Sequence, residues 1–221
     1  MLLLTRPTLV VRVEVMNGGY TMGLFTKKNE TSGSIEWLIV GLGNPGSQYE
    51  KTRHNCGWLT ADKLAEKYNV KLKKLKFKSL CAEATISGKK CLIMKPTTMM
   101  NSSGEAVVEA MNFYKIPIEN VLVICDDISL DLGKLRVKRK GSDGGQKGLR
   151  SIIYLSGKDT FPRVKIGIGA KPNPEYDLAD WVLSRFTDKE FVTMNEAFDK
   201  AITGVELIVD GKIDEAMNRL N

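Results

Sequence analysis

Histidine is nearly absent from this sequence, and no metal-binding or membrane-spanning pattern is found in it. Its 221 residues contain one histidine, His54. The four cysteines stand at positions 56, 81, 91 and 125 without a Cys-x-x-Cys pair, so we expect no zinc site and no other metal site. No apolar run is long enough to cross a membrane. Because such isolated cysteines are typical of reduced proteins, we expect a cytoplasmic location.

The overall composition is that of a globular protein with a moderate excess of positive charge. Hydrophobic residues make up 43% of the chain and charged residues 27%, and 221 residues are enough for one domain with a proper core. Lysine and arginine number 33 against 26 acidic residues, which gives a net charge of +7. Such an excess indicates a nucleic-acid partner only where the charges cluster.

The most informative segment covers residues 37–58. Trp37 to Val40 is a short apolar run, which predicts a strand buried on both faces, and a loop with three glycines follows it. This loop carries Asn44, and His54 comes ten residues later. Open α/β sheets place their sites beyond the C-terminal ends of their strands. Taken alone, His54 is about equally well explained as a packed or exposed histidine.

Apolar strands that alternate with helical patterns predict one α/β domain over residues 37–221, with a twisted, mostly parallel or mixed sheet flanked by helices. Ser102 or Ser103 is expected to cap one helix, and Leu72, Leu75 and Phe77 indicate side chains packed on the core. The patterns predict strands at about 79–86, 90–95, 121–125, 135–137 and 164–169, helices that end near 68, 114 and 155, and helices at 178–186, 190–209 and 213–220.

Residues 1–36 are predicted to be a flexible N-terminal extension. Residues 26–34 are polar, whereas Val11, Val13 and Val15 alternate with charged residues and are compatible with one isolated strand. We hypothesise that Met22 is the natural start. An intact mass of the native protein that includes residues 1–21 would contradict this hypothesis.

Three loops that follow predicted strands carry polar residues suited to chemistry. Asn44 and His54 lie in the first loop, Asn101 lies in the second, and Asp126–Asp127 ends the third strand. A histidine base is commonly oriented by a carboxylate that accepts its second ring N–H. Asp126 is the better candidate because it follows the buried strand directly, although the reverse assignment to Asp127 stays open. No Gly-x-Ser-x-Gly nucleophile pattern is present, so the set favours a water activated by histidine.

Two other patterns have competing interpretations. Residues 41–46 fit Gly-x-Gly-x-x-Gly, but about ten polar residues follow instead of a helix, which disfavours a nicotinamide or flavin enzyme and predicts no cofactor. Between residues 134 and 150 stand seven basic residues and one acid, Asp143. This cluster is interpreted either as a solvated surface or as a phosphate-binding patch for a nucleic acid.

The ordered motifs resemble those of bacterial-type peptidyl-tRNA hydrolases over about residues 37–220. They are Leu-Ile-Val-Gly-Leu-Gly-Asn-Pro-Gly, Thr-Arg-His-Asn, Lys-Pro-Thr-Thr-Met-Met-Asn-Ser-Ser-Gly, Asp-Asp, the glycine-rich loop of residues 141–148 (the third glycine loop) and Val-Lys-Ile-Gly-Ile-Gly. The resemblance implies a monomeric α/β enzyme without a cofactor. Such an enzyme cleaves the ester between a peptide and the 3′ end of tRNA, and recycles peptidyl-tRNA released prematurely from ribosomes.

The same resemblance implies a role for each matching residue. His54 would activate water, Asp126 would support His54, and Asn44 would help distinguish a blocked amino group from a free one. The positions implied to contact the substrate or the tRNA 3′ end are Tyr49, Met99, Asn101 and Lys147, and those implied to contact phosphates of the acceptor stem are Arg136, Lys138 and Lys165.

The third glycine loop departs from the family pattern. Residues 144–148 are Gly-Gly-Gln-Lys-Gly, where the family usually has Gly-Gly-His-Asn-Gly, and Met99 stands where an aromatic residue is more usual. Since an ammonium group has no acceptor, Lys147 is expected to contact a terminal phosphate in place of the amide's contacts. The alternative is a non-catalytic RNA-binding or splicing-factor relative with the same fold. That alternative predicts salt-sensitive RNA binding without ester cleavage.

Overall fold

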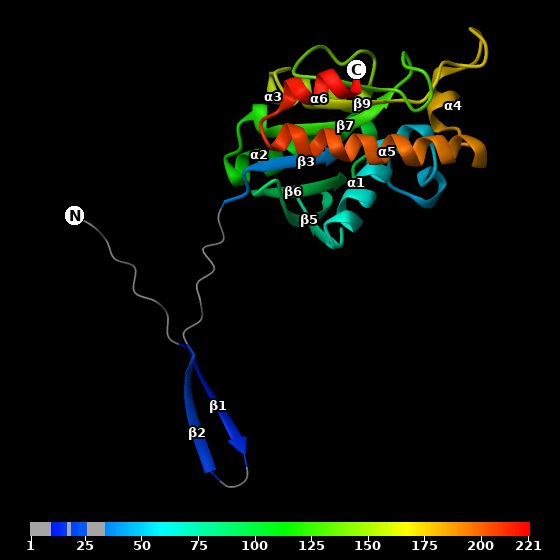
Figure 1. Cartoon of the computed structure of the whole chain (residues 1–221). Coiled ribbons are helices and arrows are strands. Elements are labelled where there is room, and N and C mark those ends of the chain that lie inside the picture. The colour runs from blue at the N-terminus through cyan, green and yellow to red at the C-terminus, as the bar shows by residue number, and fades with distance from the viewer. Residues whose placement is uncertain (1–9, 17–18, 26–33) are drawn as a thin grey trace. The chain divides into compact units, whose positions relative to one another are not determined.

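The structure is a computed structural model that describes residues 10–16, 19–25 and 34–221 (Figure 1). It divides into two compact units, residues 1–34 and 35–221. In the first unit β1 (Val10–Met16) and β2 (Gly19–Phe25) pair antiparallel, so the strand compatible with the alternating valines is present. The flexibility predicted for residues 26–34 concerns a segment that, except for residue 34, lies outside the described residues.

The second unit is built on a seven-stranded mixed sheet with the strand order β4-β5-β6-β3-β7-β9-β8. Its centre is parallel, because β3 pairs with β6 and β7, and β7 pairs with β9. The carboxyl ends of these four strands therefore meet at one edge of the sheet. The central strands are β3 (Trp37–Gly41), β6 (Lys89–Pro96), β7 (Val121–Asp127) and β9 (Arg163–Gly167), and the antiparallel outer strands are β4 (Lys74–Lys76), β5 (Ser79–Ile86) and β8 (Leu135–Lys138).

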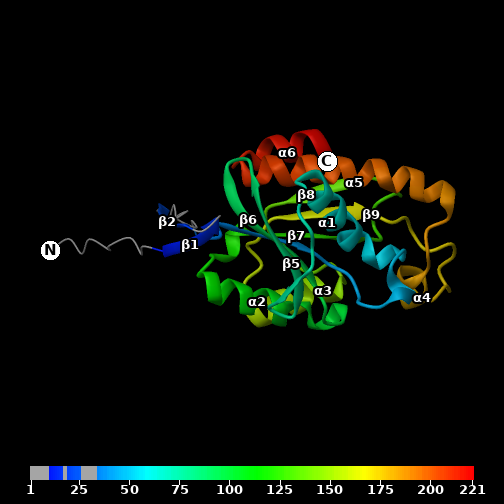
Figure 2. The same ribbon diagram turned by 90° about the horizontal axis from the view of Figure 1, so that it is seen from below.

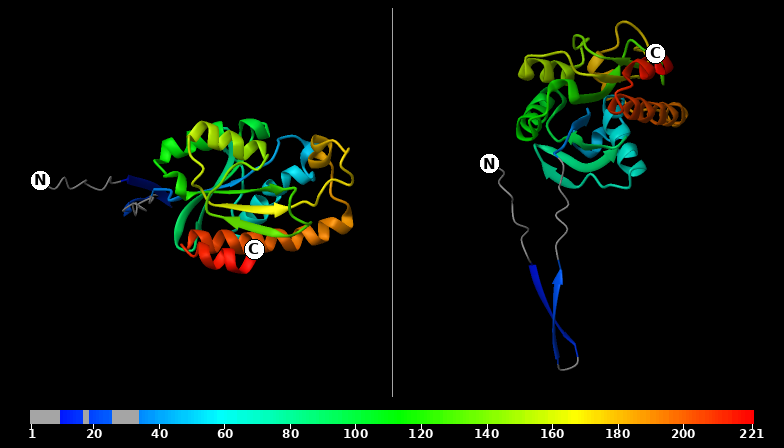
Figure 3. Two further views of the ribbon diagram at one scale, coloured as in Figure 1. Left: turned by 90° about the horizontal axis from the view of Figure 1, so that it is seen from above. Right: turned by 60° about the vertical axis from the view of Figure 1, so that its left-hand side comes forward.

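Helices cover both faces of this sheet, as Figures 2 and 3 show from several sides. Alternation along β3 divides the core accordingly: Leu38 and Val40 pack in the cluster that contains Val107 and Leu149, whereas Ile39 packs in the opposite cluster. Both faces of the strand are thus buried, which explains why its sequence is uniformly apolar. One face carries α1 (Cys56–Lys67), α5 (Asp188–Val209) and α6 (Ile213–Leu220), and the other carries α2 (Ser103–Tyr114) and α3 (Lys147–Ser156).

The start of α1 approaches the sheet so closely that only glycine fits at two positions. A Cβ on Gly41 would lie 2.3 Å from the carbonyl oxygen of Gly57, and a Cβ on Gly57 would lie 2.4 Å from that of Ile124. Because the preceding turn, Arg53–Asn55, is continuous with α1, this close contact also fixes the position of His54.

The α/β class, the mixed sheet and the predicted helices are confirmed, although the helix predicted at 178–186 ends at Leu183. Two other local predictions are wrong. Leu75 is 71% exposed, because it lies on the short strand β4, which the sequence pattern did not reveal. Ser102 makes no side-chain cap bond to α2, and the Ser103 hydroxyl donates to the carbonyl of Met100 instead. Within the described part of the chain, no helix is long and apolar enough to cross a membrane.

Candidate active site

A pocket of about 490 Å³ lies where the loops after β3, β6 and β7 meet. Asn44, His54 and Asp126 line it together, so the fold brings side chains from positions 82 residues apart into one site. The helix α4 (Leu178–Leu183) adds an apolar wall to this polar group. The wall consists of Leu178, Ala179, Val182 and Leu183.

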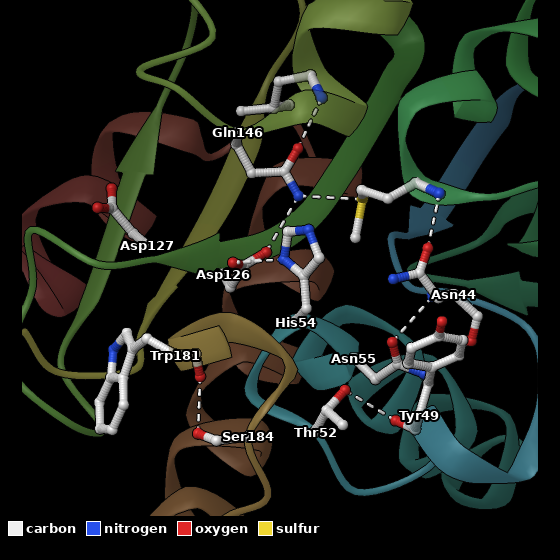
Figure 4. A network of polar contacts seen from close by, with 12 residues as sticks. Asn44, Tyr49, Thr52, His54, Asn55, Asp126, Asp127, Gln146, Trp181 and Ser184 are labelled. Atoms are coloured by element: carbon white, nitrogen blue, oxygen red, sulfur yellow. Dashed lines mark hydrogen bonds and ion pairs between the residues drawn. The ribbon is translucent and has the colours of Figure 1, made fainter. Parts of the chain in front are cut away.

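His54 and Asp126 form a buried pair in this pocket. His54 Nδ1 lies 2.8 Å from Oδ2 of Asp126 at the end of β7 (Figure 4). Exposure is 8% for His54 and 3% for Asp126, so water competes little for this hydrogen bond. An ionised carboxylate only accepts hydrogen bonds, so Nδ1 carries the proton of the neutral ring. Nε2 then keeps a lone pair beside the pocket, as a general base requires.

The pKa of His54 lies above its ordinary value of 6.5. Burial is the largest single effect and lowers the pKa, and the charge of Lys147 lowers it further. The negative charge of Asp126 and its hydrogen bond together outweigh both effects. Burial, with the charge of Asp126, also raises the pKa of the Cys56 thiol well above its ordinary range, so Cys56 stays protonated and is no nucleophile.

Asn44 is held by hydrogen bonds to its backbone and to its side chain. Its N–H donates to Oδ1 of Asn55 over 2.8 Å, and its carbonyl accepts from Nδ2 of Asn55 over 3.0 Å. The Oδ1 atom of Asn44 accepts the backbone N–H of Met100 at 2.7 Å, which leaves its amide nitrogen for a ligand. Sequence reasoning assigned no role to Asn55; its position directly after His54 was the only signal available.

Gln146 is a second residue whose contribution sequence reasoning missed. It is 7% exposed, and its Nε2 donates over 3.0 Å to Oδ1 of Asp126, the oxygen that His54 does not use. The only feature of the sequence that points to Gln146 is its place in the third glycine loop, at the position where the family usually has histidine.

Asp127 pairs with Lys165 instead of His54. Lys165 Nζ lies 2.6 Å from Asp127 Oδ2, and both side chains are 9% exposed. Burial raises the pKa of Asp127, but hydrogen bonds from Lys165 and Ser129 outweigh burial and hold the pKa below its ordinary value of 3.8. The geometry thus favours Asp126 over Asp127 as the partner of His54, the assignment that the sequence preferred but left open.

The residues implied to contact the substrate are only partly brought together. Met99, Asn101 and Lys147 line the same pocket as His54. Tyr49 is half-buried in the turn Ser47–Tyr49 and lies outside this lining, in the loop that continues from Asn44 (Figure 4).

The residues implied to contact phosphates lie on the last two strands of the sheet. Arg136 and Lys138 are exposed on β8, and Arg136 is paired in register with Lys165 on β9. Lys165 itself is buried and lines the pocket. Partners on neighbouring strands project from the same face, so Arg136 and Lys165 make a short basic row that leads into the pocket.

Arg53 fastens the turn that carries His54 to α4 and α5. Its guanidinium lies 3.9 Å from the ring centre of Trp181 and donates to the hydroxyl of Ser184. Its NH2 group also contacts both carboxylate oxygens of Glu190, at 2.8 and 3.0 Å. The apolar wall of the pocket is therefore held against the base of the His54 turn.

This arrangement suits activation of a water molecule beside a bound carbonyl group. His54 could supply a basic nitrogen, the contact of Asp126 with Nδ1 could stabilise an imidazolium, and Asn44 could offer an uncharged donor. Among the described residues, no group of three or more His, Cys, Asp or Glu side chains is placed to hold a metal ion.

Known proteins resemble the chain over most of its length. The family model of peptidyl-tRNA hydrolase matches residues 38–221. A peptidyl-tRNA hydrolase of Thermoanaerobacter sp. (strain X514) is 51% identical over 185 residues, which are 84% of this chain and 99% of the relative. That of Caldicellulosiruptor bescii is 47% identical over 187 residues, which are 85% of this chain and 97% of the relative.

A solved structure agrees with these sequence matches. The crystal structure of peptidyl-tRNA hydrolase from Acinetobacter baumannii matches with a TM-score of 0.78 at 39% identity, and the match covers 84% of this chain and 94% of that chain. The matches span the α/β unit from β3 onward and nearly all of each relative. The chain therefore belongs to the peptidyl-tRNA hydrolase family.

Proposed function

We propose that this protein hydrolyses the ester that joins a peptide, or an N-blocked amino acid, to the 3′ end of tRNA. In a cell this reaction would recycle peptidyl-tRNA released prematurely from ribosomes. The observation that carries the proposal is the buried His54–Asp126 pair in the pocket of a chain of this family. The pair favours the enzyme over a non-catalytic RNA-binding or splicing-factor relative.

His54 acts as the general base in the proposed reaction. Its Nε2 removes a proton from water while the water oxygen attacks the ester carbonyl, whose electrons move to its oxygen. When this tetrahedral intermediate collapses, the carbonyl re-forms and the bond to the ribose oxygen breaks, and that oxygen takes the proton from His54. Asp126 accepts the hydrogen bond from Nδ1 and so stabilises the imidazolium. General-base catalysis of this kind contributes about 10² to 10⁴-fold.

The two asparagines of the pocket position the substrate. Because its Oδ1 is occupied by the Met100 N–H, Asn44 offers an N–H donor. A blocked amino group carries an acyl carbonyl that accepts from this donor, whereas a free ammonium group only donates. Asn101 approaches the scissile ester from the loop after β6, and Met99 and Lys147 complete the contacts within the pocket.

The remaining contacts are made to tRNA outside the ester itself. Tyr49 contacts the 3′ end of the tRNA, and Arg136 and Lys138 bind phosphates of the acceptor stem. Lys165 extends this row, but its ammonium group is already paired with Asp127, so a phosphate would bind it beside that carboxylate. We further propose a monomer located in the cytoplasm, which light scattering after gel filtration and cell fractionation would test.

The first experiment measures release of N-acetyl-amino acid from N-acetyl-aminoacyl-tRNA. We expect release by the wild type, a loss of about 10² to 10⁴-fold in His54→Ala, and little release from the unblocked aminoacyl-tRNA. Gel-shift binding of the same tRNA serves as the control for folding and RNA recognition. A folded, tRNA-binding wild type that releases nothing would contradict the enzyme and favour the RNA-binding alternative.

A further inference from the structure

The side chain of Gln146 connects the first turn of α3 to Asp126 at the end of β7 and to Met100 in the loop after β6. Its Nε2 lies 3.0 Å from Oδ1 of Asp126 and 3.2 Å from the sulfur of Met100. Its Oε1 accepts the backbone N–H of Leu149 over 2.8 Å, so the same side chain caps α3. Figure 4 shows the amide next to Asp126 and His54.

The two ends of this amide have different partners and are not interchangeable. The Leu149 N–H needs an acceptor, and the Asp126 carboxylate needs a donor, so the amide oxygen faces the helix and the nitrogen faces the carboxylate. Asp126 therefore has a separate donor on each oxygen, Gln146 on Oδ1 and His54 on Oδ2. The terminal torsion of an aspartate is broad when it is free, and two opposed donors hold it at one angle.

We propose that Gln146 is a positioning residue for the His54–Asp126 pair and acts through Asp126. Fixing the carboxylate keeps its Oδ2 aligned with Nδ1 of His54, which retains the ring proton on Nδ1 and the lone pair on Nε2. The effect on turnover rests on the proposed function. The effect on the His54 tautomer needs no substrate, so the two can be tested separately.

The Gln146 amide can donate to Asp126 and accept from the Leu149 N–H at every pH. The histidine that the family usually has at this position can do both only while it is neutral. A neutral imidazole also offers one donor and one acceptor, but a protonated one has two donors and leaves the Leu149 N–H without a partner. The pKa of His54 itself lies above its ordinary value, because burial, which lowers it, is outweighed by the charge and the hydrogen bond of Asp126. The charged groups that line the pocket around the His54–Asp126 pair are Asp127 from β7, Lys147 from α3 and Lys165 from β9.

Three substitutions separate the capping role of Gln146 from its contact with Asp126. Gln146→Ser keeps an oxygen that can cap α3 but is too short to reach Asp126. Gln146→Glu keeps the length and the capping oxygen, but places an acceptor against the Asp126 carboxylate. Gln146→His restores both a donor and an acceptor.

The His54 tautomer is the first measurement, by ¹⁵N chemical shifts of the imidazole. The wild type and the Ser and Glu variants each contain one histidine, so the signal needs no assignment. We expect the Nδ1–H tautomer in the wild type above the pKa of His54, and a mixture of both tautomers in Gln146→Ser and Gln146→Glu. Thermal unfolding midpoints for Gln146→Ser that equal the wild type would attribute the change to positioning instead of a lost helix cap.

Turnover of N-acetyl-aminoacyl-tRNA is the second measurement. We expect kcat to fall about 10- to 100-fold in Gln146→Ser at nearly unchanged KM, by analogy with the loss seen when the residues that orient metal-binding histidines are mutated. Gln146→His should recover kcat at high pH and add a second ionisation to the pH profile. The wild-type tautomer together with full kcat in Gln146→Ser would overturn the inference. If the wild type releases nothing but the tautomer still shifts in Gln146→Ser, the proposed function fails and the positioning role is supported.

Discussion

The site depends on individual contacts to Asp126, whose two oxygens meet two different side chains. His54 binds one oxygen and Gln146 the other, while the adjacent Asp127 is engaged with Lys165. The two neighbouring carboxylates thus have different partners: Asp126 contacts His54 and Gln146, and Asp127 contacts Lys165. This separation allows each aspartate to be tested with the other as its control.

Asp126→Asn is expected to lower hydrolysis by about 10² to 10⁴-fold, because an amide neither stabilises the imidazolium nor enforces the Nδ1–H tautomer. It should also lower the pKa of His54, since the charge of Asp126 is what raises it. Titration of the imidazole by NMR checks the pKa, and release of N-acetyl-amino acid checks the rate. The matched control is Asp127→Asn, for which we expect an unchanged pKa of His54; equal pKa changes in both variants would contradict the pairing.

The pH dependence follows from the raised pKa of His54. The base must be neutral, so kcat/KM should rise with pH through a midpoint above 6.5. Stability should change in the opposite sense. The protonated His54–Asp126 pair contributes stability that is fully present below the pKa of an unfolded histidine and is lost as pH rises through the higher folded value. Urea unfolding of the wild type and of His54→Ala across this range measures the difference, and a kinetic midpoint below 6.5 would contradict the assignment.

At the scale of elements, the His54 turn is held from two directions. The close contact of Gly57 with β7 places the start of α1, and the Arg53 guanidinium connects the turn to α4 and α5. A second backbone connection reinforces the first, because the Arg53 N–H donates to the Ser184 carbonyl over 3.0 Å. These contacts connect the pocket wall directly to the turn that carries His54.

Arg53→Lys is expected to lower the free energy of unfolding by about 1–3 kcal/mol. Lysine keeps the charge, but its ammonium cannot contact both oxygens of Glu190 and also reach Ser184 and the Ile168 carbonyl in the fork geometry of arginine. Urea denaturation provides the measurement. Arg139→Lys, at an exposed pair with Asp214, is the control and should change stability by less than about 0.5 kcal/mol. Equal losses in both variants would show that Arg53 does not anchor the turn.

At the scale of the whole molecule, the chain carries a net charge of +7, and basic side chains lie on the two strands at one end of the sheet, β9 and β8. The exposed side chains of Arg136 and Lys138 lie on β8, at one end of the sheet. Lys165 on the neighbouring strand connects them to the site. A tRNA acceptor stem bound along this row, as proposed above, would have its 3′ end close to the pocket that His54 lines.

Arg136→Ala is expected to weaken tRNA binding and to reduce the slope of log affinity against log salt by about 1, because one phosphate contact releases about one counterion. The rate for saturating N-acetyl-aminoacyl-tRNA should stay close to the wild type. Fluorescence titration at several salt concentrations measures the slope. Lys200→Ala, which removes an exposed charge from α5, should leave the slope unchanged; an equal effect of both substitutions would show that only net charge matters.

The sequence by itself determined the α/β class, the buried central strands and the polar loops that follow them. These features are local, because uniformly apolar runs such as Trp37–Val40 and Val121–Cys125 report burial on both faces. The ordered motifs also identified the family, which the comparisons confirm.

Only the tertiary structure decided which polar groups meet. Consecutive strand residues point to opposite faces, so Asp126 falls on the side of the His54 turn and Asp127 on the side of Lys165. The contact of Gln146 with Asp126 depends likewise on how the glycine loop returns to β7. The side-chain hydrogen bonds that build the site join residues between 20 positions apart, as in Gln146–Asp126, and 137 positions apart, as in Arg53–Glu190. Packing and strand order decide these pairings, and local sequence patterns contain no information about either.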